Sequence, residues 1–553
     1  MEARAYPGKG LSLLQLAFAM NEELKRTAFS PLVNLDEVSQ LDNDISVGLA
    51  TIREWRNTFN RTNRLPFDIL SLIPIHLPPH KDRFRASFVC RHWRRTFLRR
   101  AELWSDLDLT KGEDYVKTLL ERAKGSQLFV LFRGHKMVPT STMMLLSPHT
   151  NQIRDLVFVS RGWADILRFI DTNPGPFPLL DSLAFNTTSE DSDVMVCPTR
   201  LFGTAVNLRE FYFYSTSVST WSPSLGHFVF PNLTLFDFVV QQSEDFRALR
   251  LFDFLEASPM LQTVRMSIVA NISLDGIPQE RVVTLPNVKD LDIIVTDCGP
   301  GYEIITYISC PSIASMSFML QGDPETMVLE EIFPTPALWN AIIRRYARSP
   351  VEEITLLLNI LARVTCTLTL RSSDGTAIGL SLGVKAYNGV RDEVHHQVFT
   401  EATSSILYHP QLANVKRFRI CHSYEYISPA FTPRIANESG RLFKSLGPLD
   451  ELTIYRCDVK PYFLFFLGIL EGRIEAPAVF SPIKQLTISH PMCPSVEEFR
   501  AAVVGLAHLR HALGVPFERV IIRAGGLPAG LEEELRPWVG SAEYCYEDPH
   551  GDH

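Results

Sequence analysis

A short unit with apolar residues at its first, fourth and sixth positions recurs along the chain from about residue 150 onward. Alternation of apolar and polar residues over so few positions is typical of a half-buried strand. The first seven copies begin 25 to 28 residues apart, and the last three steps are 34 residues each. Spacing this regular predicts an array of similar structural units. The twelve copies begin at Ile153, Leu180, Leu208, Leu233, Leu261, Val288, Ile313, Val351, Val415, Leu449, Ile483 and Phe517.

The segments between these strands carry further patterns. Two alternating runs flank Asp374-Gly375, which is typical of a β-hairpin, so we expect an inserted hairpin at about 362–400. Helical spacing predicts return helices at Leu249, Phe252 and Leu255, and at Phe463, Phe466, Leu467 and Leu470. Residues 526–553 are acidic and contain proline, and we expect them to form a C-terminal tail, either a cap on the repeats or a loose end.

One helical pattern precedes residue 63. Its apolar residues recur at steps of three or four, at Leu41, Ile45, Leu49, Ile52, Trp55 and Phe59. This spacing predicts an amphipathic helix over 41–62, with Asp42 or Asn43 as its N-cap. We expect the helix to pack against the segment that follows, although a short coiled coil is an alternative. Residues 1–40 are expected to form a flexible leader.

The stretch 63–109 combines prolines with large apolar residues. Pro66 suits the first helical position, where a missing N–H costs nothing. Pro74 should end or kink that helix, because it cannot donate and disfavours helix at the preceding residue. A second helical face is predicted by the spacing of Phe84, Phe88, Val89, Trp93 and Phe97. A unit this small cannot bury so many large side chains alone, so the leftover apolar surface indicates a partner or a neighbouring domain.

Composition narrows the class of protein. The 553 residues allow several domains, and 46% apolar with 21% charged residues is typical of a folded chain. A net charge of −8 argues against general nucleic-acid binding and gives no steering toward a membrane. The nine cysteines include no Cys-x-x-Cys pair, so neither a zinc site nor a disulfide framework is indicated. We therefore expect a reducing compartment, the cytoplasm or the nucleus. No apolar run reaches the ~20 residues of a transmembrane helix.

Three short motifs are candidates for sites of chemistry. Residues 379–383 match the G-x-S-x-G element of hydrolases around Ser381, but that element needs a strand, a tight turn and a helix. Ser381 lies instead inside an alternating run, which favours a hairpin strand. His395-His396 lacks further ligands at metal spacing, which favours a surface loop. The basic segment Lys81–Arg100 is typical of a solvated helix face more than of a nucleic-acid contact. No nucleotide-binding motif occurs, so no cofactor is expected.

The stretch 63–109 resembles an F-box. It opens with Leu65-Pro66, carries Val-Cys-Arg-His-Trp-Arg at 89–94 and ends with Leu103-Trp104. It departs from the usual pattern at His76–Phe84, which lacks the Asp-Pro-x-Asp element, and at Pro74, which shortens the first helix. The resemblance implies docking on the Skp-family adaptor of an SCF-type cullin-RING ubiquitin ligase. It also implies an adaptor-facing surface formed by Leu65, Pro66, Ile69, Ile73, Leu77, Val89, Cys90 and Trp93.

The repeats over 110–525 resemble degenerate leucine-rich repeats, although the usual Asn or Cys after the third apolar residue is mostly absent. The resemblance implies an α/β solenoid, curved and irregular, that follows a small all-α F-box. Residues between the apolar positions of each strand would then face outward on the concave side. Tyr and Arg anchor interfaces most often. The candidate substrate-binding residues are Tyr212, Tyr214, Arg265, Asp292, Arg417, Arg419 and Tyr455.

The sequence thus predicts a non-catalytic substrate receptor that binds the adaptor through its F-box and a protein substrate through its repeats. The arrangement of helix, F-box and irregular repeats resembles the F-box proteins of mushroom-forming fungi. Two alternatives stay open: a repeat scaffold that binds no adaptor, and a hydrolase that uses Ser381. At any single outward residue, a solvated sheet face without a ligand is also an alternative.

Overall fold

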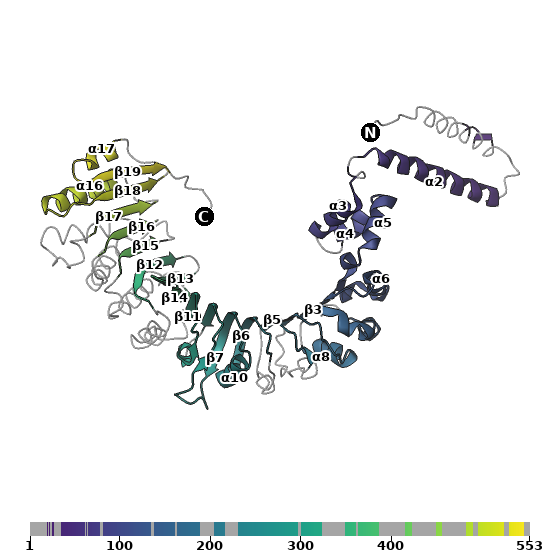
Figure 1. Ribbon diagram of the computed structural model, residues 1–553, viewed down its shortest axis with the longest axis horizontal. Coiled ribbons are helices and arrows are strands. Elements are labelled where there is room, and N and C mark those ends of the chain that lie inside the picture. Colours follow the sequence, from purple (N-terminus) through teal and green to yellow (C-terminus); the bar gives the residue numbers. More distant parts are fainter. Residues whose placement is uncertain are drawn as a thin grey trace. The chain divides into compact units, whose positions relative to one another are not determined.

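A computed structural model of the chain describes residues 19, 22, 25–26, 35–60, 62, 65–77, 81–133, 138–160, 163–187, 204–215, 230–296, 300–322, 349–360, 363–385, 415–422, 449–455, 483–489, 496–524 and 530–546. The chain divides into two units, and each is described by itself. The first unit consists of Met1–Asp106 with Leu119–Ser126, and the second of Leu107–Thr118 with Gln127–His553. Figure 1 shows helices in the first unit and strands through most of the second.

The first long helix, α2, spans Leu35–Thr58 and so begins six residues before the expected range of 41–62. Trp55 and Phe59 stack edge to face, with ring centroids 5.0 Å apart. Val47 and Leu49 are about half exposed, as is Trp55. The apolar stripe of this helix therefore stays largely uncovered, and its packing on the segment that follows stays a prediction.

Three short helices follow. The α-helix α3 ends at Leu72, directly before the 3-10 turn η2 that contains Pro74, as the proline predicts. The expected single helical face from Phe84 to Phe97 is wrong, because α4 ends at Ser87 and α5 begins at Arg91. The amide N–H groups of Phe88 and Val89 close a tight turn there. The bounds are α3 Phe67–Leu72, η2 Ile73–His76, α4 Lys81–Ser87, α5 Arg91–Arg99 and η3 Ala101–Trp104.

Trp104 lies at the centre of the helical core and is 2% exposed. Its indole N–H donates a hydrogen bond to the carbonyl oxygen of Phe97 at 3.0 Å, which satisfies the only polar group of the ring. The ring of Phe84 meets Trp104 edge to face at 5.2 Å between centroids. The guanidinium of Arg122 lies 4.7 Å from the ring centroid of Trp104, which is a cation–π contact.

The second unit is a large, mostly parallel sheet. Each of the twelve repeat motifs forms a strand, so the periodic pattern predicted these strands correctly. They are β3 Ile153–Ser160, β4 Ser182–Thr187, β5 Glu210–Ser215, β6 Leu235–Arg247, β7 Thr263–Ser273, β9 Asp290–Thr296, β11 Ser315–Gly322, β12 Val351–Ile360, β15 Arg417–His422, β16 Glu451–Tyr455, β17 Gln485–Ser489 and β18 Arg519–Ala524.

The remaining elements extend or cover this sheet. In Figure 1 the helices α8 and α10 lie along the same side of strands β3 to β7. The other elements are β1 Asp106–Asp108, η4 Leu109–Lys111, α6 Glu113–Ala123, β2 Leu128–Arg133, α7 Thr140–Met144, η5 Ser147–Gln152, α8 Trp163–Thr172, α10 Ala248–Glu256, β8 Val283–Thr284, η7 Pro300–Tyr307, β10 Ile308–Ser309, β13 Arg363–Ser372, β14 Ala377–Lys385, α16 Val496–Ala512, α17 Leu531–Leu535 and β19 Ser541–Tyr546.

Neighbouring strands pair so that the same apolar positions of each repeat lie side by side, and these aligned side chains form the core. Phe185 of β4 pairs with Phe213 of β5, which pairs with Phe238 of β6. All three side chains are fully buried, and the rings of Phe213 and Phe238 stack at 5.3 Å. Trp163 of α8 lies over Phe213 at 5.9 Å between ring centroids. A one-residue slip would turn every such side chain to the other face, so burial fixes the register.

The hairpin region differs from a simple insertion. β13 and β14 pair antiparallel around Asp374 and Gly375, and Gly375 has a φ of +87°, a conformation that favours glycine. β14 then pairs in parallel with β11, and β12 pairs in parallel with β15. The spatial order is therefore β11-β14-β13-β12-β15. The three strands lie within the main sheet, and β13 alone runs antiparallel to its neighbours among the described strands.

Asparagine side chains join successive repeats at the turns before several strands. Nδ2 of Asn207 donates to the carbonyl oxygen of Pro178 at 2.7 Å, one repeat earlier. Asn232 and Asn287 make the same bond to Val206 and Pro259, at 3.1 and 3.0 Å. These bonds satisfy turn carbonyls that no strand pairs. Each Asn directly precedes the first apolar position of its repeat, a position to which the sequence pattern assigned no role.

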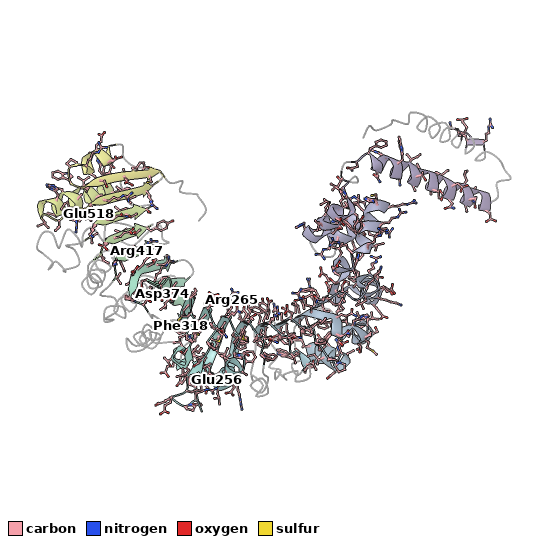
Figure 2. The ribbon with its side chains drawn as sticks, in the orientation of Figure 1. Glu256, Arg265, Phe318, Asp374, Arg417 and Glu518 are labelled. Atoms are coloured by element: carbon pink, nitrogen blue, oxygen red, sulfur yellow. The ribbon has the colours of Figure 1, made fainter. Side chains whose placement is uncertain are left out.

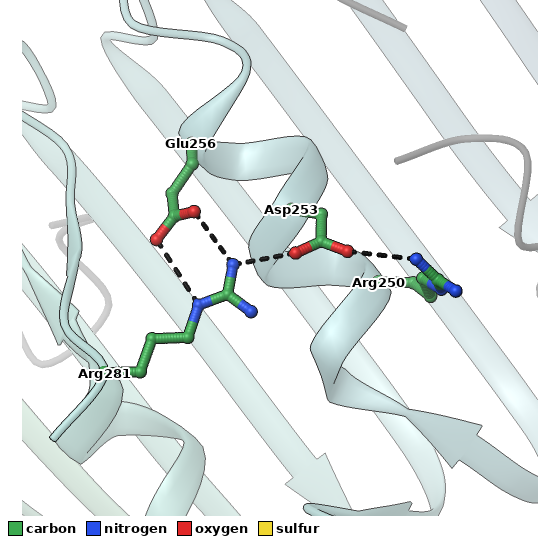
Figure 3. A network of polar contacts seen from close by, with 4 residues as sticks. All are labelled: Arg250, Asp253, Glu256 and Arg281. Carbon is green, nitrogen blue, oxygen red and sulfur yellow. Dashed lines mark hydrogen bonds and ion pairs between the residues drawn. The ribbon is translucent and has the colours of Figure 1, made fainter. Parts of the chain in front are cut away.

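An ion-pair network fixes the segment between β7 and β8 to helix α10 (Figure 3). Nη2 of Arg281 lies 2.8 Å from a carboxylate oxygen of Asp253 and 2.8 Å from one of Glu256. Arg250 contacts the other oxygen of Asp253 at 3.3 Å. The Arg281 side chain is 16% exposed, so solvent weakens these contacts less than it weakens a surface pair.

The described part of the C-terminal segment, residues 530–546, contains the helix α17 and the strand β19. β19 pairs in parallel with β18, which continues the sheet beyond the expected boundary at residue 525. Arg510 of α16 is buried, and its guanidinium donates to the carbonyl oxygen of Ile483 at 2.9 Å. The expected return helix around Phe463 to Leu470 lies outside the described residues, whereas α10 contains Leu249, Phe252 and Leu255 as expected.

Candidate interaction surfaces

The helical unit exposes large apolar side chains. We call Phe67, Ile69, Leu72, Phe88 and Val89 the apolar helical surface. Phe67, Ile69 and Leu72 belong to α3 and are 38–49% exposed, and Phe88 and Val89 form the turn before α5 and are 65% and 59% exposed. Several large apolar side chains left exposed on one small unit are typical of an interaction site.

The predicted adaptor-facing residues divide into two groups. Pro66, Ile69 and Val89 are exposed and accessible to a partner. The half-buried ones also contact the unit itself: Trp93, for example, packs on the buried Phe97 with ring centroids 5.5 Å apart. The half-buried group consists of Leu65, Ile73, Leu77, Cys90 and Trp93.

Three exposed apolar residues were missing from the predicted set, namely Phe67, Leu72 and Phe88. The six-residue α3 is too short to bury a full stripe, so residues on several of its sides remain accessible. Phe88 was assigned to a continuous helical face, which hid its place in a turn. Arginines border this surface: the guanidinium of Arg94 lies 5.2 Å from the ring centroid of Phe88 and that of Arg99 lies 5.9 Å from Phe67.

The outward face of the sheet carries a polar cluster on β5, β6, β7 and β9. The strand register places Tyr212, Asp237, Arg265 and Asp292 side by side on these four strands. Figure 2 shows Arg265 on the opposite side of the sheet from Glu256 of α10. We call Glu210, Tyr212, Tyr214, Asp237, Arg265 and Asp292 the acidic tyrosine patch.

Asp237 is the centre of this patch and is only 8% exposed. The hydroxyl of Tyr214 donates to its carboxylate at 2.9 Å, and a guanidinium nitrogen of Arg265 lies 4.0 Å away. The hydroxyl of Tyr212 donates to Glu210 at 3.2 Å. Tyr212, Tyr214, Arg265 and Asp292 were predicted as binding residues, and the structure brings these four together. Asp237 was missed, although it occupies the same repeat position as Tyr212.

Burial shifts the acid–base properties of the patch. It raises the pKa of Tyr214 to about 12, and the hydrogen bond to Asp237 adds to the shift because it stabilises the protonated hydroxyl. Burial also raises the pKa of Asp237, against the opposing effects of the Tyr214 hydroxyl and Arg265. The patch therefore holds a carboxylate that is partly removed from water.

The remaining predicted binding residues lie farther along the sheet, beyond β11, β14 and β13. Arg417 and Arg419 both contact the buried carboxylate of Glu353, with closest distances of 3.6 and 3.4 Å. Tyr455 lies half-buried on the adjacent strand β16. An open groove of about 500 Å³ lies beside them, lined by charged residues at the starts of β12 and β15 to β18.

The described residues give no support to other chemistry. Ser381 lies within β14, where its backbone pairs with β13 and β11, and this is not the strand–turn–helix geometry of a nucleophile elbow. His395 and His396 lie outside the described residues. In the part of the chain that the structure describes, no cluster of His, Cys, Asp or Glu could hold a metal ion. Among the same residues, no helix has the length and apolarity to cross a membrane.

Comparison with known families finds one match, in the helical unit. Residues 62–110 match the family described as F-box-like, against the expected range of 63–109. The chain therefore carries an F-box-like domain, which contains α3, α4 and α5 together with the apolar helical surface. No curated protein matches the chain.

Proposed function

We propose that the chain is the substrate-recognition subunit of an SCF-type ubiquitin ligase. The observation that carries this proposal is the F-box-like domain at 62–110, whose α3 and pre-α5 turn leave five large apolar side chains exposed. In this proposal a Skp-family adaptor covers the apolar helical surface, together with Leu65, Pro66, Ile73, Leu77, Cys90 and Trp93. The chain itself performs no bond chemistry, and holding a substrate near the ligase raises its effective concentration.

The sheet unit is the proposed substrate-binding part. We infer that it is a solenoid similar to leucine-rich repeats, because seven of its strands recur at 25 to 28 residues, the last four recur at 34 residues, and within each series neighbouring strands pair in parallel. Its outward strand positions carry Tyr and Arg, the residues that most often anchor interfaces. We propose Tyr212, Tyr214, Arg265, Asp292, Arg417, Arg419 and Tyr455 as substrate contacts.

Co-purification with a Skp-family adaptor tests the proposal. The wild-type chain should capture the adaptor in stoichiometric amount. An Ile69→Asp, Val89→Asp variant should lose it, since two buried charges in an apolar interface cost several kcal/mol. Both side chains are about half exposed in the free chain, so the variant should fold normally.

A matched control separates loss of the surface from a general effect of charge. Val206→Asp, Met260→Asp introduces the same charges at residues of the sheet unit with similar exposure, 57% and 45%. This variant should capture the adaptor as the wild type does. A well-folded wild-type chain that captures no adaptor would contradict the proposal and leave an adaptor-independent repeat scaffold as the better account.

A further inference from the structure

The helix α2 carries a seam with the spacing of a coiled coil. Its positions follow one another at strictly alternating steps of three and four residues, which is the heptad repeat of two helices that wind around each other. The first position and the last two are 48–58% exposed. We call this row the α2 seam: Val38, Leu41, Ile45, Gly48, Ile52, Trp55 and Phe59.

Gly48 is the one small residue of the α2 seam. Glycine weakens the interior of a helix, so its place there needs a reason. The described chain gives none, because apart from the backbone of α2 itself no described atom lies within 4 Å of the point where a Cβ would stand. A second helix would give one, because a bulky side chain of that helix could fill the space over the glycine.

An antiparallel second copy of α2 fits this seam. In such a pair, alternate seam positions of one helix pack beside the intervening positions of the other. With the twofold axis near residue 50, Ile52 of one copy lies over Gly48 of the other, and Ile45 lies beside Trp55. Large side chains are then matched with smaller ones at each level. A parallel pair would instead place Gly48 beside Gly48 and leave a void in the middle of the seam.

Charged residues beside the seam favour the same arrangement. Asp42 follows one seam position in the first half of α2, and Arg56 follows another in its last turn, and both side chains are exposed. In the antiparallel pair, Asp42 of each copy faces Arg56 of the other copy, and the exposed Leu49 midway between them meets its counterpart on the axis. Within one helix, or in a parallel pair, Asp42 and Arg56 stay about 21 Å apart along the axis and cannot pair.

We propose that two copies of this chain associate through the α2 seam as an antiparallel coiled coil. The interface is isologous, since each copy contributes the same residues. The F-box-like domain follows α2 directly, so the two domains leave the pair at opposite ends of a helix about 36 Å long. The association does not depend on the proposed function. In that function, the dimer would hold two substrate-binding units and bind a substrate with two binding segments more tightly.

Sedimentation equilibrium of the full-length chain measures the association. The wild type should approach twice the 62.6 kDa of one chain as its concentration rises. Ile45→Asp, Ile52→Asp should remain a monomer over the same range, because each dimer would bury four carboxylates in the seam. The matched control is Val47→Asp, Ala50→Asp, which introduces the same charges on the face of α2 opposite the seam. This control should dimerise as the wild type does.

Charge exchange tests the antiparallel arrangement without disturbing the apolar seam. Asp42→Arg alone, or Arg56→Asp alone, should raise the dissociation constant of the dimer about tenfold, since two like-charge contacts replace two ion pairs. Both substitutions in one chain should restore the wild-type constant. An equimolar mixture of the two single variants should restore it too, because each helix then supplies the charge that the other has lost. These variants also decide the question if the seam variant loses its helix, which far-UV circular dichroism would show.

The outcomes separate this inference from its rivals. A wild type that stays monomeric, or a seam variant that dimerises as the wild type does, would overturn the proposal and leave the cover of α2 to its own chain. No recovery in the mixture would overturn the antiparallel arrangement. Ile69→Asp, Val89→Asp should dimerise normally, and loss of the dimer there would assign the association to the apolar helical surface instead. The seam variant should still capture the Skp-family adaptor, so the dimer and the proposed function can fail independently.

Discussion

The helical unit and the sheet unit use apolar residues in opposite ways. In α3 and the turn after α4, large apolar side chains such as Ile69 and Phe88 are half exposed or more. In the strands, the apolar residues of each repeat are buried and polar residues face outward. Substituting an apolar side chain of the sheet unit should therefore change stability, whereas substituting one on the apolar helical surface should change the proposed adaptor binding.

The difference follows from how each unit buries its residues. A strand in a repeated sheet has neighbours on both sides, so its apolar positions are covered by the next repeat. The short helices have one shared core around Trp104, and the residues beyond that core have nothing to cover them. In the proposed function, the sheet unit would therefore bind a ligand through charge and hydrogen bonding, and the helical unit would bind one through apolar contact.

The largest expected difference is in the free energy of unfolding, between variants that each replace one phenylalanine of one unit. Phe213→Ala should lower the free energy of unfolding by about 3–5 kcal/mol, because it leaves a cavity between Trp163 and Phe238. Phe88→Ala removes the same ring from a side chain that is 65% exposed and should change stability by less than about 0.5 kcal/mol. Urea unfolding of both variants measures this contrast. A similar loss in both would break the comparison.

A polar contact in the sheet unit should have a smaller effect. Arg281→Met removes the cation between Asp253 and Glu256 and should cost about 1–2 kcal/mol, less at high salt. Arg250→Met removes only a single part-buried pair within one helix turn and should cost at most about 0.5 kcal/mol. Chemical denaturation at low and high salt measures both costs. Equal costs for the two substitutions would show that the network does not fix the segment after β7.

The asparagine bonds between repeats should contribute less each. Asn207→Ala removes one exposed side-chain hydrogen bond to the Pro178 carbonyl and should cost about 1 kcal/mol. Asn186→Ala, at an exposed position of β4, makes no such bond among the described residues and serves as the control. Thermal unfolding that ranks the two variants in the opposite order would show that the turn bond does not stabilise the array.

The last prediction concerns alkaline pH. The pKa of Tyr214 is raised from 10.0 to about 12 in the folded chain, so its protonated form is favoured by folding. This contribution to stability is complete below the pKa of Tyr214 in the unfolded chain, and it is lost as the pH rises through the pKa of Tyr214 in the folded chain. The wild type should therefore lose more stability than Tyr214→Phe as the pH rises from 10.0 to about 12, which denaturant unfolding across that range measures. Identical pH profiles would contradict the shift.

The sequence predicted where the strands lie along the chain better than it predicted their order within the sheet. Strand positions follow from local alternation, and each of the twelve repeats begins at most two residues before its strand, as Leu233 does before β6 and Ile483 before β17. Pairing is not local: the spacing around Asp374 indicated a hairpin but not that β14 would join β11. The strands β1 and β2 and the terminal β19 carry no full copy of the repeat, and were missed for that reason.

The sequence predicted which face of the sheet each candidate site residue occupies, but not which of these residues contact one another. Alternation places Tyr212 and Arg265 on the outward face of the sheet, and this much is local. Which of these residues meet depends on register between strands about 27 residues apart, and the buried Asp237 between them became visible only with that register. In the helical unit, the break after Ser87 depends on tertiary packing, so Phe88 was assigned to a helix that ends before it.

The antiparallel strand β13 also bears on how the chain is assembled during synthesis. From β2 to β11, each strand of the main sheet that leaves the ribosome finds a partner strand already made. β12 appears before its parallel partner β15, whereas β14, made later, docks backward on β11. β12 and β13 therefore join the sheet only after β14, residues 377–385, has been made and docks on β11. Translation pauses in this interval would expose the edge of β12, and chaperone capture should concentrate there.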